Sequence, residues 1–239
     1  MKNLCKPLII VIVLIFFIRN QQLFAQITID EIITKHLEAS GFNNIPSELK
    51  KFKVEGEMIQ NKIHFPLTIN GILPDKLRMD LIYNNQNFSK ISNGPVSWDY
   101  NPANDSIKTY INKKTESLDF IDRLTGELYN YKNGIIKINL LGILSIDDVE
   151  LYKLEVQVDK SVRIYYIDKL SYLIRRIDDD VVENRITYYS DYRKVGKYLL
   201  PFSLTGFEGG LSSISMQFKS IIVNPDIKEE LFDKPLLNK

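Results

Sequence analysis

The chain has 239 residues, of which 31 are basic and 30 acidic, and it contains a single cysteine. Because the charge is nearly balanced and no basic run occurs, nothing in the sequence argues for an anionic membrane surface as a partner, and nucleic acid is not expected as one. The cysteine, Cys5, lies at the very start, so the rest of the chain can form no disulfide, thiol nucleophile or thiolate metal site.

The first 25 residues have the pattern of a secretory signal peptide. Lys2 and Lys6 precede an uncharged apolar run, residues 8–18, which is too short to span a membrane, and the small residue Ala25 ends the segment. We expect cleavage after Ala25, with an uncleaved anchor as the alternative. Since the cysteine lies upstream of the apolar run, we expect a periplasmic protein that is not itself a lipoprotein. Residues 26–239 contain no linker or repeat and are expected to form one domain.

A helix is predicted over residues 28–40. Thr28 and Glu31 have capping-box spacing, apolar residues recur on one helical face, and Gly41 provides a C-terminal stop. His36 is expected at the edge of the apolar stripe. A helix of this length is marginal alone, so its stripe needs a surface to cover.

From Phe52 onward the hydrophobic period changes to two. Residues 62–69 (KIHFPLTI) and 76–83 (KLRMDLIY) alternate apolar with polar side chains, and a break is expected at Asn70-Gly71 and Pro74-Asp75. The same alternation continues to residue 223 and predicts about ten or eleven strands with short connections. The fold is therefore expected to be mainly β, an antiparallel meander.

A second helix is predicted inside this run of strands, at residues 115–124 (TESLDFIDRL), and a last helical turn at 227–232 (IKEELF). Because the mid-chain helix lies among strands, it must cross a face of the sheet or cap an opening. A strongly bent sheet with such a helix has a concave apolar surface, which is either filled by side chains or open to an apolar ligand.

Motifs for catalysis are missing from the sequence. His36 and His64 are the only histidines, and there is no nucleophile elbow, phosphate-binding loop or dinucleotide-binding turn. Acidic runs at 147–148, 178–180 and 229–230 stand at predicted turns or helix starts, where solvated carboxylates are common. We therefore expect no enzyme, no cofactor and no metal; a carboxylate hydrolase is the remaining catalytic alternative.

One stretch resembles a known family. Residues 73–79 (LPDKLRM) are followed by a strand and then by residues 93–102 (NGPVSWDYNP). This order is similar to that of the LolA/LolB-like outer-membrane lipoprotein-sorting superfamily, in which a Pro-led strand precedes an Asn-Gly or Asp-Gly turn, a Trp strand and an Asn-Pro corner. Residues 189–204 (YSDYRKVGKYLLPFSL) and 223–235 (VNPDIKEELFDKP) support the resemblance.

The resemblance implies a single, strongly curved antiparallel sheet that forms an incomplete, half-open β-barrel with helices over its concave face. A lipid or the acyl chain of a lipoprotein would bind there, with Trp98 aimed into or beside the cavity; a core tryptophan of the barrel wall is the alternative. The carrier of this family has an Arg, tied to lipoprotein handover, where this chain has Leu73. That departure affects transfer and leaves the cavity intact.

We therefore expect a monomeric, non-catalytic binding protein that shields an acyl chain, in lipid or lipoprotein sorting. The alternative is an envelope structural or interaction module with a filled core and a protein partner at an exposed strand edge. Strand alternation and helical spacing select the expected lining, and a one-residue slip would invert the set from any one strand. That lining is Leu77, Met79, Leu81, Trp98, Leu118, Ile121, Leu124, Ile164, Tyr166, Met216 and Phe218.

Overall fold

The computed structural model describes residues 27–43, 48–111, 116–158, 161–179, 185–208 and 212–237. The predicted signal peptide lies outside these ranges. Within them, no helix combines the length and the apolar character needed to cross a membrane.

The helices and strands follow one another in a simple order along the chain. They are α2 (Ile29–Ser40), β1 (Lys51–Gln60), β2 (Ile63–Ile72), β3 (Lys76–Tyr83), β4 (Gln86–Asn93), β5 (Val96–Asn101), β6 (Ser106–Ile111), α3 (Glu116–Thr125), the 3₁₀ helix η1 (Glu127–Asn130), β7 (Ile136–Ile146), β8 (Val149–Val158), β9 (Ser161–Asp168), β10 (Ile174–Asp179), β11 (Arg185–Val195), β12 (Tyr198–Glu208), β13 (Ser212–Val223) and the 3₁₀ helix η2 (Glu229–Phe232).

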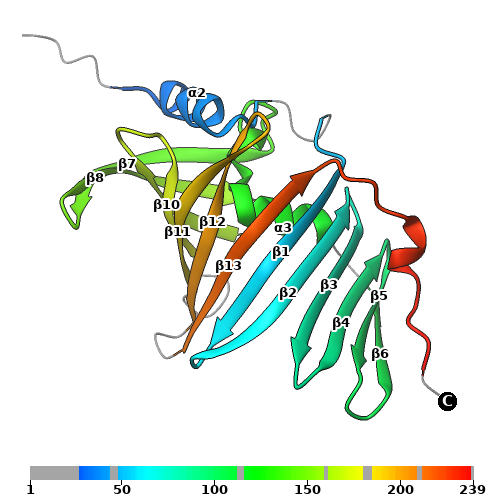
Figure 1. The fold of residues 1–239 in the computed structure, drawn as a ribbon. Coiled ribbons are helices and arrows are strands. Elements are labelled where there is room, and N and C mark those ends of the chain that lie inside the picture. The colour runs from blue at the N-terminus through cyan, green and yellow to red at the C-terminus, as the bar shows by residue number, and fades with distance from the viewer. Residues whose placement is uncertain are drawn as a thin grey trace, which may run out of the picture.

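The thirteen strands form one antiparallel sheet in the order β6-β5-β4-β3-β2-β1-β13-β12-β11-β10-β9-β8-β7 (Figure 1). The end strands β6 and β7 do not pair with each other, so the sheet is a curved, half-open barrel. This confirms the mainly β class and the incomplete barrel, with more strands than the sequence predicts. Figure 1 shows β7 to β13 curling around α3, while β1 to β6 extend from them as a wing.

The predicted first helix is confirmed almost to the residue. Thr28 Oγ1 accepts a hydrogen bond from the backbone N–H of Glu31 (3.2 Å), and Gly41 adopts the left-handed conformation that ends the helix. His36 is buried, not at the edge of the stripe as expected. Its Nδ1 donates to the carbonyl of Tyr172 (2.8 Å) in the β9–β10 connection, which joins α2 to the end of the sheet.

The second helix, α3, lies across the concave face and contacts β12 and β3. Phe120 of α3 stacks on Phe52 of β1, with ring centroids 5.3 Å apart. The Phe52 ring in turn lies against Gly71, where an added Cβ would overlap it. The predicted break at Asn70-Gly71 is therefore wrong. The strand continues to Ile72 because the missing side chain of Gly71 gives the Phe52 ring its place.

We predict that Gly71→Ala lowers the free energy of unfolding by about 1–3 kcal/mol, because the new methyl group must displace the Phe52 ring from its contact with α3. Gly206→Ala is the matched control, since a Cβ there would lie at an ordinary 3.7 Å from the carbonyl oxygen of Ile214. Urea unfolding of the two variants measures the difference. Equal losses in both would contradict the account of Gly71.

A second prediction concerns pH. Burial lowers the pKa of His36 from 6.5 to about 4, despite its hydrogen bond to Tyr172. The unfolded chain therefore binds this proton at higher pH than the folded chain, and stability is lost as pH falls from about 6.5 to about 4. The full effect is about 3 kcal/mol. His36→Gln removes this titration, so the difference in unfolding free energy between the two proteins should change by that amount; parallel pH profiles would disprove it.

Candidate functional site

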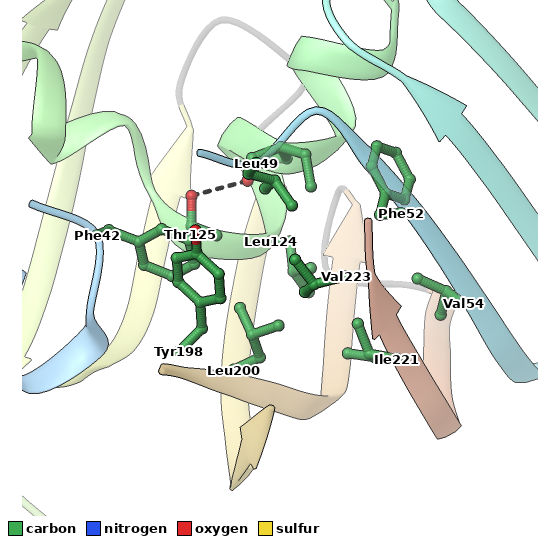
Figure 2. A pocket seen from close by; sticks show the side chains of 11 residues that line it. Phe42, Leu49, Phe52, Val54, Leu124, Thr125, Tyr198, Leu200, Ile221 and Val223 are labelled. Atoms are coloured by element: carbon green, nitrogen blue, oxygen red, sulfur yellow. Dashed lines mark hydrogen bonds between the residues drawn. The ribbon is translucent and has the colours of Figure 1, made fainter. Parts of the chain in front are cut away.

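Side chains pack closely in the part of the concave face next to α3, which we call its upper part. Between α3, the sheet and Phe42 and Leu49 of the α2–β1 connection remains a cavity of about 10 Å³, close to the space that one water molecule needs. Figure 2 shows its apolar side chains converging, with the Thr125 hydroxyl donating to the carbonyl of Ile121 (2.9 Å). The lining is Phe42, Leu49, Phe52, Val54, Ile121, Leu124, Thr125, Tyr198, Leu200, Ile221 and Val223. An acyl chain has no room there while α3 stays in place.

A second part of the same face is apolar and only half covered. We call the side chains of Met58, Met79, Leu81, Leu204 and Met216 the methionine strip. All five are partly exposed, and four of them pack against the buried core. Register places Met216 opposite both Met58 on β1 and Leu204 on β12. Met79 and Leu81 on β3 lie opposite the buried Ile69 and Leu67 of β2, which separate them from Met58. The strip therefore borders the buried core on strands that flank β1 on both sides.

An ion-pair network holds η1 against the inner face. Glu127 is buried and pairs with Arg163 of β9, whose Nε also donates to Asp179 Oδ2 at 3.1 Å. The hydroxyl of Tyr165 donates to Glu127 Oε1 (3.2 Å). Burial alone would lower the pKa of Arg163, but the two carboxylates raise it above its usual range, so the guanidinium remains charged. Breaking the pair would leave the buried Glu127 carboxylate without its countercharge, which is costly.

Gly126 lies between α3 and this network. Its φ of 71° and ψ of 146° are accessible only to glycine, and a Cβ there would clash with Ile174 and press on the Tyr165 ring. The backbone conformation of Gly126 and the ion pair of Glu127 thus hold the C-terminal end of α3 close to the sheet.

Most of the predicted lining residues do lie together on the concave side. Leu77, Ile121, Leu124 and Phe218 belong to the buried core. Met79, Leu81 and Met216 belong to the methionine strip. Leu118 is in α3, but its side chain lies outside the described part of the chain.

Trp98 lies on the opposite, convex face. It is directly across from Ile91 of β4 and packs with the cluster of Ile91, Ile227 and Phe232. The last two belong to the C-terminal segment, which crosses this face and is held by hydrogen bonds such as Arg78 Nη1 to the carbonyl of Leu231 (3.2 Å). The expected position of Trp98 in the cavity is therefore corrected, because the register of β5 turns it toward this segment.

Ile164 and Tyr166 are also displaced from the expected lining by one residue. On β9 it is Tyr165 and Ile167 that enter the core, whereas the Tyr166 hydroxyl donates to Asp178 Oδ2 (3.0 Å) and its ring faces the guanidinium of Arg176. Two adjacent tyrosines gave no indication of which one points inward.

The acidic runs have different environments. Asp147 and Asp148 lie at a turn with positive φ, as expected, but Asp178 and Asp179 lie inside β10 and pair with Arg176 and Arg163, which corrects the predicted turn. In the part of the chain that the structure describes, no three histidine, cysteine or acidic side chains gather as a metal site. His64 is exposed and donates to Glu57 Oε2 (2.9 Å).

Met58, Leu204 and Phe52 are absent from the predicted lining although they lie on the concave side. The signal for Met58 was available, since Val54, Gly56 and Met58 alternate along β1 in phase with buried Phe52. Leu204 follows the same rule on β12, two residues beyond Phe202. The contact between Phe52 and Phe120 joins two segments far apart in the sequence and gave no such signal.

The chain matches no protein-family model, and no curated protein sequence is significantly similar to it. Solved structures do share its fold. A LolA superfamily protein from Nitrosomonas europaea has a TM-score of 0.55 at 13% identity, over 87% of this chain and 99% of that one. A domain described as an outer-membrane lipoprotein-sorting protein, from Vibrio parahaemolyticus, has a TM-score of 0.55 at 12% identity, over 85% and 95%.

The chain has the LolA-type fold. A protein of the DUF1329 family from Desulfovibrio piger shares it too, with a TM-score of 0.57 at 11% identity over 84% of this chain and 97% of that one. The resemblance noted in residues 73–102 is thereby confirmed at the level of fold.

We predict that Trp98 reports on the C-terminal segment. Trp98 is the only tryptophan, so Phe232→Ala, which removes the buried ring of its cluster, should shift the emission to longer wavelength and cost about 3 kcal/mol of stability. Leu236→Ala, at a position that is 89% exposed, is the control and should change neither. Added fatty acid should leave the wild-type emission unchanged. A large ligand-induced shift would instead place Trp98 at the ligand.

Proposed function

We propose that the protein is a non-catalytic binding protein that shields the acyl chain of a lipid or lipoprotein on its concave face. The methionine strip is the observation that carries this proposal. It is apolar, half exposed and continuous with the core, and it lies on the inner face of a LolA-type fold. Unbranched, polarizable methionine side chains adapt to flexible chains, and each CH₂ group removed from water contributes about 0.8 kcal/mol.

The geometry favours one path for such a chain. Because α3 and the aromatic pair of Phe52 and Phe120 fill the upper part of the face, the ligand would lie below α3, along Met79, Leu81 and Met216. The ion pair between Glu127 and Arg163 holds the end of the helix against displacement. Binding along the strip requires no opening of the upper cavity.

The predicted signal peptide and the described role of the Vibrio parahaemolyticus domain suggest the setting: the periplasm, and lipid or lipoprotein sorting to the outer membrane. Holding a lipid is better supported than transferring it. Leu73, where the carrier of the family has an Arg, packs against the core and so presents no charge to a partner.

An envelope interaction module is the second candidate, and one observation favours it. The upper cavity has a volume of only about 10 Å³, which supports a core filled by the protein's own side chains. In that case the methionine strip would be partly exposed apolar surface without a ligand. A protein partner would bind to another part of the sheet.

Native mass spectrometry of the full-length protein, expressed with its leader and purified without detergent, distinguishes the two candidates. We expect a stoichiometric adduct that extracts into organic solvent as a lipid. Met216→Lys should abolish the adduct, whereas Gln217→Lys, which adds the same charge to the exposed neighbour on the opposite face, should retain it.

The binding proposal fails if wild-type protein shows a bare mass after incubation with fatty acids, phospholipids and lipopeptides. That result, together with copurification of one protein, would support the interaction module.

A further inference from the structure

The two edges of the sheet differ in how they are protected against pairing with another strand. The edge strand β7 has a bulge at Leu140 and Gly142 and contacts α2. Bulges and covering helices are common protections, because an unprotected edge is a template for a further strand. The other edge strand, β6, pairs with β5 in unbroken register. In the described parts of the chain no strand pairs with its outer side (Figure 1), so β6 is the open edge.

The residues of β6 favour pairing with a further strand. Its sequence, SIKTYI, has neither proline nor glycine and is rich in β-branched and aromatic residues. Thr109 lies on the convex face, opposite the single tryptophan on β5, so alternation places Ile107 and Ile111 on that face too. Lys108 and Tyr110 lie on the concave face. Tyr110 is 45% exposed and Ile111 76%, which leaves apolar surface uncovered on both faces of the strand.

A second β6 fits this edge in one antiparallel register. Residues that face each other must lie on the same face of the sheet, so the two-fold axis lies between one residue and its own copy. An axis at Lys108 places two lysines directly opposite each other, which is unfavourable, and an axis near either end of the strand pairs fewer residues. An axis at Thr109 places Thr109 opposite its own copy and Lys108 opposite Tyr110. It also places Ile107 opposite Ile111, so that every cross-strand pair is of a favourable kind.

We propose that two copies of this chain pair antiparallel through β6, about a two-fold axis at Thr109, and form one continuous sheet. The pairing occupies the open edge of both copies, and it replaces the monomer expected from the sequence with a reversible dimer. One pair of six-residue strands is a small contact beside the roughly 1,200–2,000 Å² of stable interfaces, so we expect a dissociation constant in the micromolar range. The methionine strip stays uncovered, because its nearest strand, β3, lies three strands from the edge. The inference therefore goes beyond the proposed function and does not depend on it.

Sedimentation velocity over a concentration series tests the dimer, with protein expressed with its leader and purified without detergent. We expect the sedimentation coefficient to rise with concentration from that of a monomer to that of a dimer. Ile111→Lys, at a largely exposed position, places a charge opposite Ile107 of the second copy. Because two such pairs are lost in each dimer, the dissociation constant should rise about tenfold. Leu141→Lys, at a 50% exposed position on the other edge strand, is the matched control and should leave it unchanged.

An engineered disulfide tests the register. In a Cys5→Ser background, which removes the only native thiol, Thr109→Cys places two thiols directly opposite each other in the dimer. Their Cα atoms would be about 4.5–5.5 Å apart, which suits a disulfide, so mild oxidation should give a crosslinked dimer. Ile107→Cys, on the same face of the same strand, is the matched control. Its two thiols would be about 14 Å apart in the proposed register and should not crosslink.

A monomer at every concentration would overturn the proposal, even if an extended peptide of another protein pairs with this edge. A dimer that Ile111→Lys leaves unchanged would overturn it too, since the contact would then lie elsewhere. Equal crosslinking through positions 107 and 109 would contradict the register. None of these outcomes bears on the binding of an acyl chain, which is tested with different variants.

Discussion

The concave face of the open sheet is apolar and must be shielded from water, and the rest of the structure depends on how that face is covered. In a closed barrel the sheet encloses its own inner face, whereas here the end strands β6 and β7 do not pair with each other. The helix α3 supplies the missing cover, and the stack of Gly71, Phe52 and Phe120 is where it meets the sheet most closely. Because one short helix cannot cover thirteen strands, an apolar remainder stays half exposed.

Two polar contacts hold the helices that cover the concave face. The pair of the buried Glu127 with Arg163 holds η1 and the end of α3, and the His36 hydrogen bond holds α2 to the β9–β10 connection. Both are buried polar contacts whose loss leaves an unpaired group inside the protein. The closely packed upper part and the partly exposed methionine strip are therefore two parts of one face. The first stabilises the fold, and the second is where we propose that a ligand binds.

The convex face is covered by a different segment of the chain. The C-terminal segment lies across the wing, with Phe232 and Ile227 against Ile91 and Trp98, and Lys76 paired to Glu229 at 2.6 Å. The single indole therefore belongs to a second, smaller core that keeps the wing from exposing apolar surface on both sides. Residues 73–102 and 223–235, two of the segments in which the sequence resembles LolA-like proteins, pack on each other through this contact.

Much of the fold was predictable from the sequence, because helix caps and the alternation of apolar with polar residues act over a few neighbouring positions. Thr28 and Gly41 mark both ends of α2, and the turn at Gly94 separates β4 from β5. The face that a strand buries was harder to predict where two adjacent residues were both aromatic, as for Tyr165 and Tyr166. It was also harder where a segment far away in the sequence covers the side chain, as for Trp98. The pairing of Glu127 with Arg163 depends on tertiary contact, and no local pattern indicated it.

The central claim is that an acyl chain lies on the methionine strip. It is tested most directly by labelling the methionine methyl groups with ¹³C and recording their NMR signals while myristate is added. The account predicts that the signals of Met58, Met79 and Met216 all shift and show contacts to the ligand chain, while the indole signal of Trp98 stays in place. Unmoved methionine signals at saturating ligand, or contacts confined to Trp98, would contradict it.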